Sequence, residues 1–252
     1  MLELKNISKK YGEAEVLKDF TLNIEKGKIT TFVGANGAGK STVLSIIARL
    51  MKACNGQILI EGEPITNIKD FEMAKKVSVL KQTNNINVKL TIRELVNFGR
   101  FPYCKGRLKK DDIEAVERAL EYLNLTEIQD KYIDELSGGQ RQRAYIAMIV
   151  AQDTEYILLD EPLNNLDMKH SVQIMKILRK LVDELGKTIL VVIHDINFAS
   201  CYSDNIVALK DGRLIKSGTA CEMICKENLK EIFDIDFNIQ EVNNNRICVY
   251  FK

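Results

Sequence analysis

The sequence predicts an α/β fold that combines a parallel sheet, an antiparallel β-subdomain and an inserted all-helical subdomain. Three observations support this prediction. The first 62 residues hold short apolar strands separated by turns at Gly12, Gly27 and Gly62, a pattern typical of an antiparallel layer. Residues 91–150 have the apolar spacing of helices. From Tyr156 onward strands alternate with helices, which indicates a parallel sheet with helices on its faces.

The size and charge of the chain narrow the classes of protein that it can belong to. Its 252 residues suffice for one large domain or for a core with a subdomain. The net charge of +1 gives no electrostatic reason to expect nucleic acid or an anionic membrane as the main partner. No apolar run approaches the ~20 residues that span a bilayer, and Met1 opens a strand directly, so we expect no signal peptide. Six cysteines without a CxxC pair predict free thiols in a reducing cytosol.

The elements follow one another in a definite order. Antiparallel strands are expected at 2–7, 21–25 and 56–60, a buried strand at 28–33 and a helix at 42–50. Helices are expected at 91–100, at 111–123 and after Ser137. Strands at 156–160 and 188–193 then alternate with helices at 168–185 and 196–202, and further strands lie around Gly212 and Gly218. A hairpin is expected across residues 243–245. We therefore divide the chain into a core with its β-subdomain (1–82 and 156–220), a helical subdomain (83–152) and a small C-terminal appendage (221–252).

A glycine-rich loop joins the strand at 28–33 to the following helix, as in a P-loop NTPase core. Its glycines let successive N–H groups and the helix N-terminus point at phosphate oxygens. Lys40 is expected to reach the terminal phosphates, and the Ser41 hydroxyl to hold Mg²⁺. The alternative is a turn that merely joins strand to helix. The candidate phosphate-binding residues are Gly34, Asn36, Gly37, Ala38, Gly39, Lys40, Ser41 and Thr42.

A second helix N-terminus follows Leu136. Ser137 and Gln140 have the spacing of a capping box, which would open a helix with bare N–H groups beside Gly139. Such an N-terminus is a ready anion site. Without the rest of the chain, a simple helix cap is the favoured interpretation.

Two carboxylates end the apolar strand at 156–160. Asp160 can hold Mg²⁺, while Glu161 can orient and deprotonate an attacking water. The alternative is a solvated acidic turn before Pro162. The preceding hydrophobic strand and the phosphate loop favour the magnesium and catalytic roles.

Together these motifs resemble the ATP-binding cassette family over nearly the whole chain. GANGAGKST resembles its Walker A motif, LSGGQRQR its signature motif and ILLDEP its Walker B motif with the catalytic glutamate. Four more positions match: Gln82 the Q-loop glutamine, residues 165–167 with Asp167 the D-loop, His194 the switch histidine and Tyr11 the adenine-stacking aromatic. Taken singly, Gln82 could be a surface amide, Tyr11 an edge residue and His194 a core or capping imidazole.

The resemblance implies an ATPase that uses Mg²⁺ and works as a homodimer. Two chains would enclose two ATP molecules, and hydrolysis would reopen the dimer. The catalytic residues implied are Glu161, His194, Gln82 and Lys40, and the magnesium ligands are Ser41, Gln82 and Asp160. Tyr11, Gln140, Asp167 and the phosphate loop are implied to bind nucleotide. Each site would combine the core residues of one protomer with Ser137 and Gly139 of its mate.

Two segments, 98–103 and 160–170, resemble the ATPases of bacterial importers for iron-siderophore, haem and cobalamin, and most resemble the iron-siderophore group. This implies integral membrane permease subunits that dock on the helical subdomain. It also implies an extracytoplasmic substrate-binding protein as an indirect partner and a peripheral place on the cytoplasmic face of the cell membrane. An exporter or lipid-transport ATPase is the nearest alternative. The sequence departs from the family pattern at the D-loop, where it has Asn164 and Asn165 and many relatives have serine and alanine.

Three other classes of protein fit less well. A chromosome-maintenance ATPase would carry a long coiled coil between Ser41 and Ser137, where the chain has no sustained heptads. A ribosome-acting relative would carry two cassettes in one chain. A non-hydrolysing regulator is expected to lack Glu161 or His194, and both are present.

Overall fold

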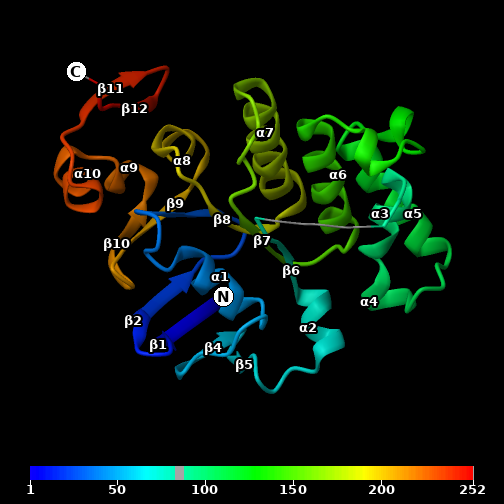
Figure 1. Ribbon diagram of the computed structural model, residues 1–252, viewed down its shortest axis with the longest axis horizontal. Helices are drawn as coiled ribbons and strands as arrows, with labels where there is room; N and C mark the ends of the chain where they lie inside the picture. Colours follow the sequence, from blue (N-terminus) through cyan, green and yellow to red (C-terminus); the bar gives the residue numbers. More distant parts are fainter. Residues whose placement is uncertain (83–87, 252) are drawn as a thin grey trace.

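The computed structural model describes residues 1–82 and 88–251. Within them, six strands form a central sheet in the order β10-β9-β3-β8-β7-β6, in which β10 is antiparallel to β9 and every other neighbouring pair is parallel (Figure 1). The strands are β10 (Arg213–Thr219), β9 (Asn205–Lys210), β3 (Ile29–Val33), β8 (Thr188–Val192), β7 (Tyr156–Asp160) and β6 (Val77–Leu80). The predicted parallel core is therefore confirmed.

An antiparallel sheet lies beside this core, at the lower left of Figure 1. Its order is β2-β1-β4-β5, with β2 (Ala14–Ile24), β1 (Leu2–Tyr11), β4 (Asn55–Ile60) and β5 (Glu63–Pro64). The first two strands are longer than predicted because they continue to a tight turn at Gly12, which has a φ of 57°. Their outer ends are exposed, so charged residues occupy positions that sequence reasoning assigns to a loop.

Helices cover both faces of the central sheet. On one face, the helices α3, α5, α6 and α7 share a buried core with Ile157, Leu159 and Val191. On the other face, α1, α2 and the antiparallel sheet pack on Phe32, Leu158 and Leu190. The helices of these two layers are α1 (Lys40–Ile47), α2 (Asp70–Lys76), α3 (Ile92–Phe98), α5 (Lys110–Tyr122), α6 (Gly138–Ala151) and α7 (Met168–Leu185). In the described part of the chain, no helix is both long and apolar enough to cross a membrane.

The helical subdomain lies on the right of Figure 1. Besides α3, α5 and α6 it contains α4 (Phe101–Cys104) and two 3₁₀ turns, η1 (Thr126–Ile128) and η2 (Ile133–Glu135). The helix predicted over 91–100 ends at Phe98, and α4 follows with Pro102 in its first turn. Residues 83–87, at the start of the predicted subdomain 83–152, lie outside the described residues.

The C-terminal part packs against the core through α8 (Ile196–Tyr202). It contains α9 (Ala220–Met223), α10 (Lys226–Phe233) and a hairpin of β11 (Asn238–Val242) and β12 (Asn245–Val249), at the upper left of Figure 1. The predicted hairpin is confirmed, and Asn243 and Asn244 form its turn with φ of 50° and 62°. None of the six cysteines, all within the described residues, is in a disulfide.

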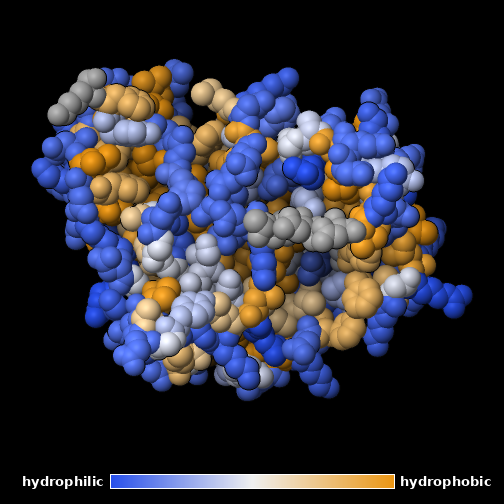
Figure 2. Space-filling model, in the orientation of Figure 1, coloured by the Kyte–Doolittle hydropathy of each residue, from blue (hydrophilic) through white to orange (hydrophobic). Residues whose placement is uncertain are grey.

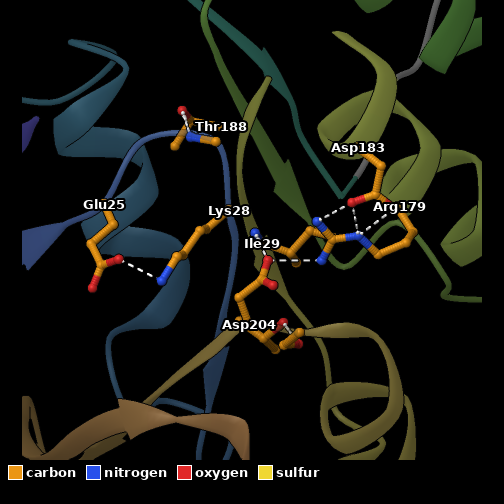
Figure 3. Close-up of polar contacts among 10 residues, drawn as sticks. Glu25, Lys28, Ile29, Arg179, Asp183, Thr188 and Asp204 are labelled. Carbon is orange, nitrogen blue, oxygen red and sulfur yellow. Dashed lines mark hydrogen bonds and ion pairs between the residues drawn. The ribbon is translucent and has the colours of Figure 1, made fainter. Parts of the chain in front are cut away.

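A polar network fixes the amino-terminal end of β3 (Figure 3). The Asp204 carboxylate accepts hydrogen bonds from the backbone N–H of Ile29 at 2.7 Å and from the Arg179 guanidinium at 2.8 Å. Arg179, on α7, also pairs with Asp183. These bonds tie α7 and the start of β9 to the strand that leads into the glycine-rich loop.

Candidate functional site

Because β3, β6, β7 and β8 are parallel, their carboxyl ends meet at one edge of the sheet. A cavity of about 530 Å³ opens at this edge. It is lined by Val16, Asn36, Gly37, Ala38, Gly39, Lys40, Ser41, Thr42, Gln82, Glu161, Asn164 and His194. The structure thus brings together most of the predicted phosphate-binding and catalytic residues, from four separate segments of the chain. This is the place where ligands bind in open α/β sheets.

The glycine-rich loop folds as phosphate binding requires. Gly37 and Gly39 have φ of 79° and 101°, which side-chain-bearing residues rarely adopt. Gly34 also has a positive φ, of 136°, and packing requires a glycine there as well, because a Cβ would lie 2.1 Å from the carbonyl oxygen of Leu209 on β9. Lys40 is buried, and its Nζ donates to the carbonyl oxygens of Gly34 and Ala35, both at 2.9 Å. Burial lowers the pKa of Lys40, and the carboxylates of Glu161 and Asp160 oppose that shift.

Ser41 and Asp160 meet as the magnesium prediction requires. The Ser41 hydroxyl donates to the Asp160 carboxylate at 2.7 Å. Burial raises the pKa of Asp160, although the hydrogen bond from Ser41 opposes the shift. A hydroxyl and a carboxylate oxygen in contact are suitable donors for Mg²⁺, which in nucleotide sites takes one or two carboxylates and completes its shell with phosphate and water. The donor set therefore fits this ion.

The Glu161 carboxylate is held by three side chains. Gln82 donates to Oε2 at 2.6 Å, His194 Nε2 lies 2.7 Å from Oε1, and the Asn164 amide also donates to Oε2. Glu161 itself has a φ of 52°, an uncommon value for a residue with a side chain. Sequence reasoning missed the contact of Asn164 with Glu161. The available signal was an amide three residues after a carboxylate, within the turn in which the Asn164 N–H donates to the Glu161 carbonyl.

The signature residues do not line this cavity. Ser137 caps α6 and forms the predicted capping box with Gln140, whose side chain accepts from the Ser137 N–H at 3.0 Å. Ser137 is exposed, whereas Gly139 is buried against the ring of His170. Asp167 caps the N-terminus of α7 by accepting the N–H of His170 at 2.8 Å. None of these four predicted nucleotide-binding residues lines the cavity of its own chain.

Tyr11 is also absent from the cavity lining. It lies at the end of β1, is 48% exposed, and its hydroxyl is 2.9 Å from the Met51 sulfur. Val16, on β2 just after the turn, does line the cavity. Sequence reasoning missed Val16 because a lone valine in a hairpin carries no sign of contact with a ligand.

Comparison with known proteins agrees with the arrangement at this edge of the sheet. The family model described as "ABC transporter" matches residues 17–164, which include the phosphate loop, the signature motif and both carboxylates. The chain belongs to the ABC transporter family. Family members bind and hydrolyse ATP, so the chain is an ATPase.

Two relatives and one solved structure show how far this ABC transporter ATPase resembles known members. The petrobactin import ATP-binding protein YclP of Bacillus subtilis (strain 168) is 60% identical over 252 residues, covering 100% of both chains. The iron(3+)-hydroxamate import ATP-binding protein FhuC of the same organism is 42% identical, covering 96% of this chain and 91% of FhuC. A bacterial ABC transporter cassette with a dimeric structure is 35% identical, with a TM-score of 0.77 over 87% of this chain and 99% of its own.

Proposed function

We propose that this ABC ATPase powers the import of iron-siderophore complexes through ATP-driven closing and reopening of a homodimer. ATP hydrolysis is supported by the position of the Glu161 carboxylate, which lies in the same cavity as Lys40 and Ser41. Gln82, Asn164 and His194 hold this carboxylate in place. The names of the relatives support the cargo, since petrobactin and iron(3+)-hydroxamate import ATP-binding proteins match nearly the whole chain.

Different residues at the cavity have different roles in hydrolysis. The loop N–H groups and Lys40 bind the phosphates of ATP, with Lys40 leaving the carbonyl oxygens that it now contacts. Ser41, Asp160 and Gln82 would hold Mg²⁺, which when bound neutralises phosphate charge. Glu161 accepts the proton of the attacking water, while His194 stabilises the γ-phosphate. For that, His194 must exchange its contact with Glu161 for one with the phosphate.

The position of the signature motif supports a site shared between two copies. Ser137 is exposed at the N-terminus of α6, and the cavity of its own chain does not include it. A helix N-terminus with exposed N–H groups is suited to a phosphate brought by a partner copy. The 35%-identical cassette is described as dimeric, which supports the same arrangement here.

A groove between the core and the helical subdomain supports a membrane partner. Its volume is about 410 Å³, and it is lined by residues of α2, β6, α3 and α6, including Met73, Phe98 and Met148. The aromatic side chains of Phe71, Phe98 and Phe101 are 42–54% exposed beside it. Figure 2 shows apolar residues gathered on this side of the molecule, at the lower right. Exposed apolar surface of this kind marks an interaction site.

We assign this groove to a cytoplasmic helix of an integral membrane permease. The ATPase would then lie on the cytoplasmic face of the cell membrane, and an extracytoplasmic substrate-binding protein would be an indirect partner. ATP-driven closure would reach the permease through the helical subdomain, with Gln82 at the boundary between core and helices.

Uptake of labelled iron by cells tests the proposed function. Cells without this chain, and without another cassette of the same specificity, should fail to accumulate ⁵⁵Fe from iron-petrobactin under iron limitation. The wild-type chain should restore uptake, and Lys40→Ala should not, because phosphate binding loses its buried charge. Lys169→Ala, at an exposed position on α7, is the matched control and should restore uptake. Normal iron uptake in the deletion strain would contradict the proposal that iron-siderophore complexes are the cargo.

A further inference from the structure

The ring of His170 is fixed from two directions at the start of α7. Its Nδ1 lies 2.7 Å from Oδ1 of Asp167, and the same oxygen accepts the backbone N–H of His170 at 2.8 Å. Because a carboxylate only accepts hydrogen bonds, Nδ1 carries the proton in this contact. One side chain therefore caps the helix and sets the orientation of the imidazole.

The ring occupies the space that Gly139 leaves free. A Cβ built on Gly139 would lie 2.2 Å from Cδ2, 2.4 Å from Cγ and 2.8 Å from Nε2 of His170. Gly139 lies within the helix α6 and does not have a positive φ, so its backbone conformation does not require glycine. The glycine is required by the close approach of the imidazole.

The neighbouring glycine provides a comparison within the same turn. A Cβ on Gly138 would meet Asn165 and Leu166 at 3.8 and 3.9 Å, which is ordinary contact. The tight approach in this turn is thus specific to Gly139. The residues that contact the two glycines all lie between positions 165 and 170. Asn164, just before them, donates to the Glu161 carboxylate.

We propose that His170 is a positioning residue for the signature motif. Held by Asp167, its ring packs on Gly139 and fixes the first turn of α6 in the orientation in which Ser137 meets the nucleotide of the partner copy. This inference rests on the proposed homodimer. Under this proposal, position 139 must be glycine because of the His170 ring of the same chain. That reason is independent of whether the partner's nucleotide also approaches Gly139.

Four proteins test the inference: wild type, His170→Ala, Gly139→Ala and the double variant. His170→Ala should lower kcat about tenfold through misplacement of the signature turn. ATP affinity of the monomer should not change, because neither residue lines the cavity. Gly139→Ala should lose more activity, since its methyl group collides with the ring. Removing the ring as well should return kcat to the level of His170→Ala.

The kcat of the double variant shows whether the His170 ring or the partner's nucleotide requires glycine at position 139. If the double variant is no more active than Gly139→Ala, the partner's nucleotide requires the glycine, and the inference is wrong. Wild-type or higher kcat in His170→Ala would also overturn it, because the ring would then be dispensable or obstructive. Lys169→Ala, next to His170 and exposed, is the matched control and should keep wild-type kcat.

Melting temperatures give a readout that does not depend on dimer formation. Gly139→Ala should lower Tm, and the double variant should recover it, because the collision lies within one chain. Failure of the proposed homodimer would appear instead as a Glu161→Gln variant that binds ATP and stays monomeric. Absence of Tm recovery would contradict the packing itself.

Discussion

At the scale of single residues, close packing explains a segment that sequence reasoning linked to cargo. Gly99 is needed because a Cβ there would lie 2.1 Å from the carbonyl oxygen of Met148 on α6. Arg100 is buried, pairs with Asp112 at 3.0 Å, donates to the Ala151 carbonyl at 2.8 Å and stacks on Tyr103. The resemblance of residues 98–103 to siderophore importers therefore reflects how α3 joins α5 and α6, and only indirectly the cargo.

Asp112→Asn should destabilise the protein by about 3 kcal/mol, because it leaves the buried Arg100 charge without its partner. Burial opposes ionisation of Asp112, but the Lys109 N–H and the Arg100 guanidinium hold its pKa below the usual range. The stabilisation is therefore complete above the unfolded pKa of about 3.9 and is lost as the pH falls through the lower folded value.

Denaturant unfolding at pH 7 and at pH 3 measures this dependence. The difference between wild type and Asp112→Asn should shrink at the lower pH. Asp111→Asn, at the exposed neighbouring position, should behave as the wild type at both. A difference that stays constant with pH would show that the ion pair is not its cause.

At the scale of elements, most of the pattern could be predicted from sequence. The helices α7 and α8 have the predicted bounds, because their apolar faces repeat with helical spacing and polar residues cap their starts. The helices α2, α9 and α10 were not expected, since they have only seven, four and eight residues, and helices this short give a weak signal in the sequence. The outer parts of β1 and β2 were missed because exposed strand ends carry charged residues.

Asn197 holds the C-terminal hairpin to α8, so its loss should loosen that hairpin first. Its amide donates to the Cys248 carbonyl at 3.2 Å, and its carbonyl accepts the Cys248 N–H at 2.7 Å. Asn197→Ala leaves both backbone groups unsatisfied, at a cost of about 1–3 kcal/mol.

Hydrogen exchange measures this loosening directly. In Asn197→Ala the amide of Cys248 should exchange faster, with smaller changes in the central sheet. Asn238→Ala, exposed on β11, is the matched control and should leave exchange at Cys248 unchanged. Equal exchange in all three proteins would show that other contacts hold the hairpin.

At the scale of the whole molecule, the sequence predicts which residues lie at the site better than it predicts the hydrogen bonds between them. The motifs place Lys40, Ser41, Asp160 and Glu161 at one edge of the sheet, because the carboxyl ends of parallel strands meet there. They could not reveal that Gln82 and His194 also hold the Glu161 carboxylate, since these two side chains come from distant segments that only folding brings together. The separation of Ser137 from the cavity likewise follows from the packing of the helical subdomain.

Because Ser137 lies away from the cavity, a complete site requires a nucleotide-dependent homodimer, and Glu161→Gln tests this requirement most directly. The substitution removes the proposed base and keeps its shape, so ATP binding should persist while hydrolysis slows by orders of magnitude. Light scattering of the purified variant should show the 28.6 kDa monomer without nucleotide and twice that mass with ATP. A variant that binds ATP and stays monomeric, or one that hydrolyses it at the wild-type rate, would contradict the account.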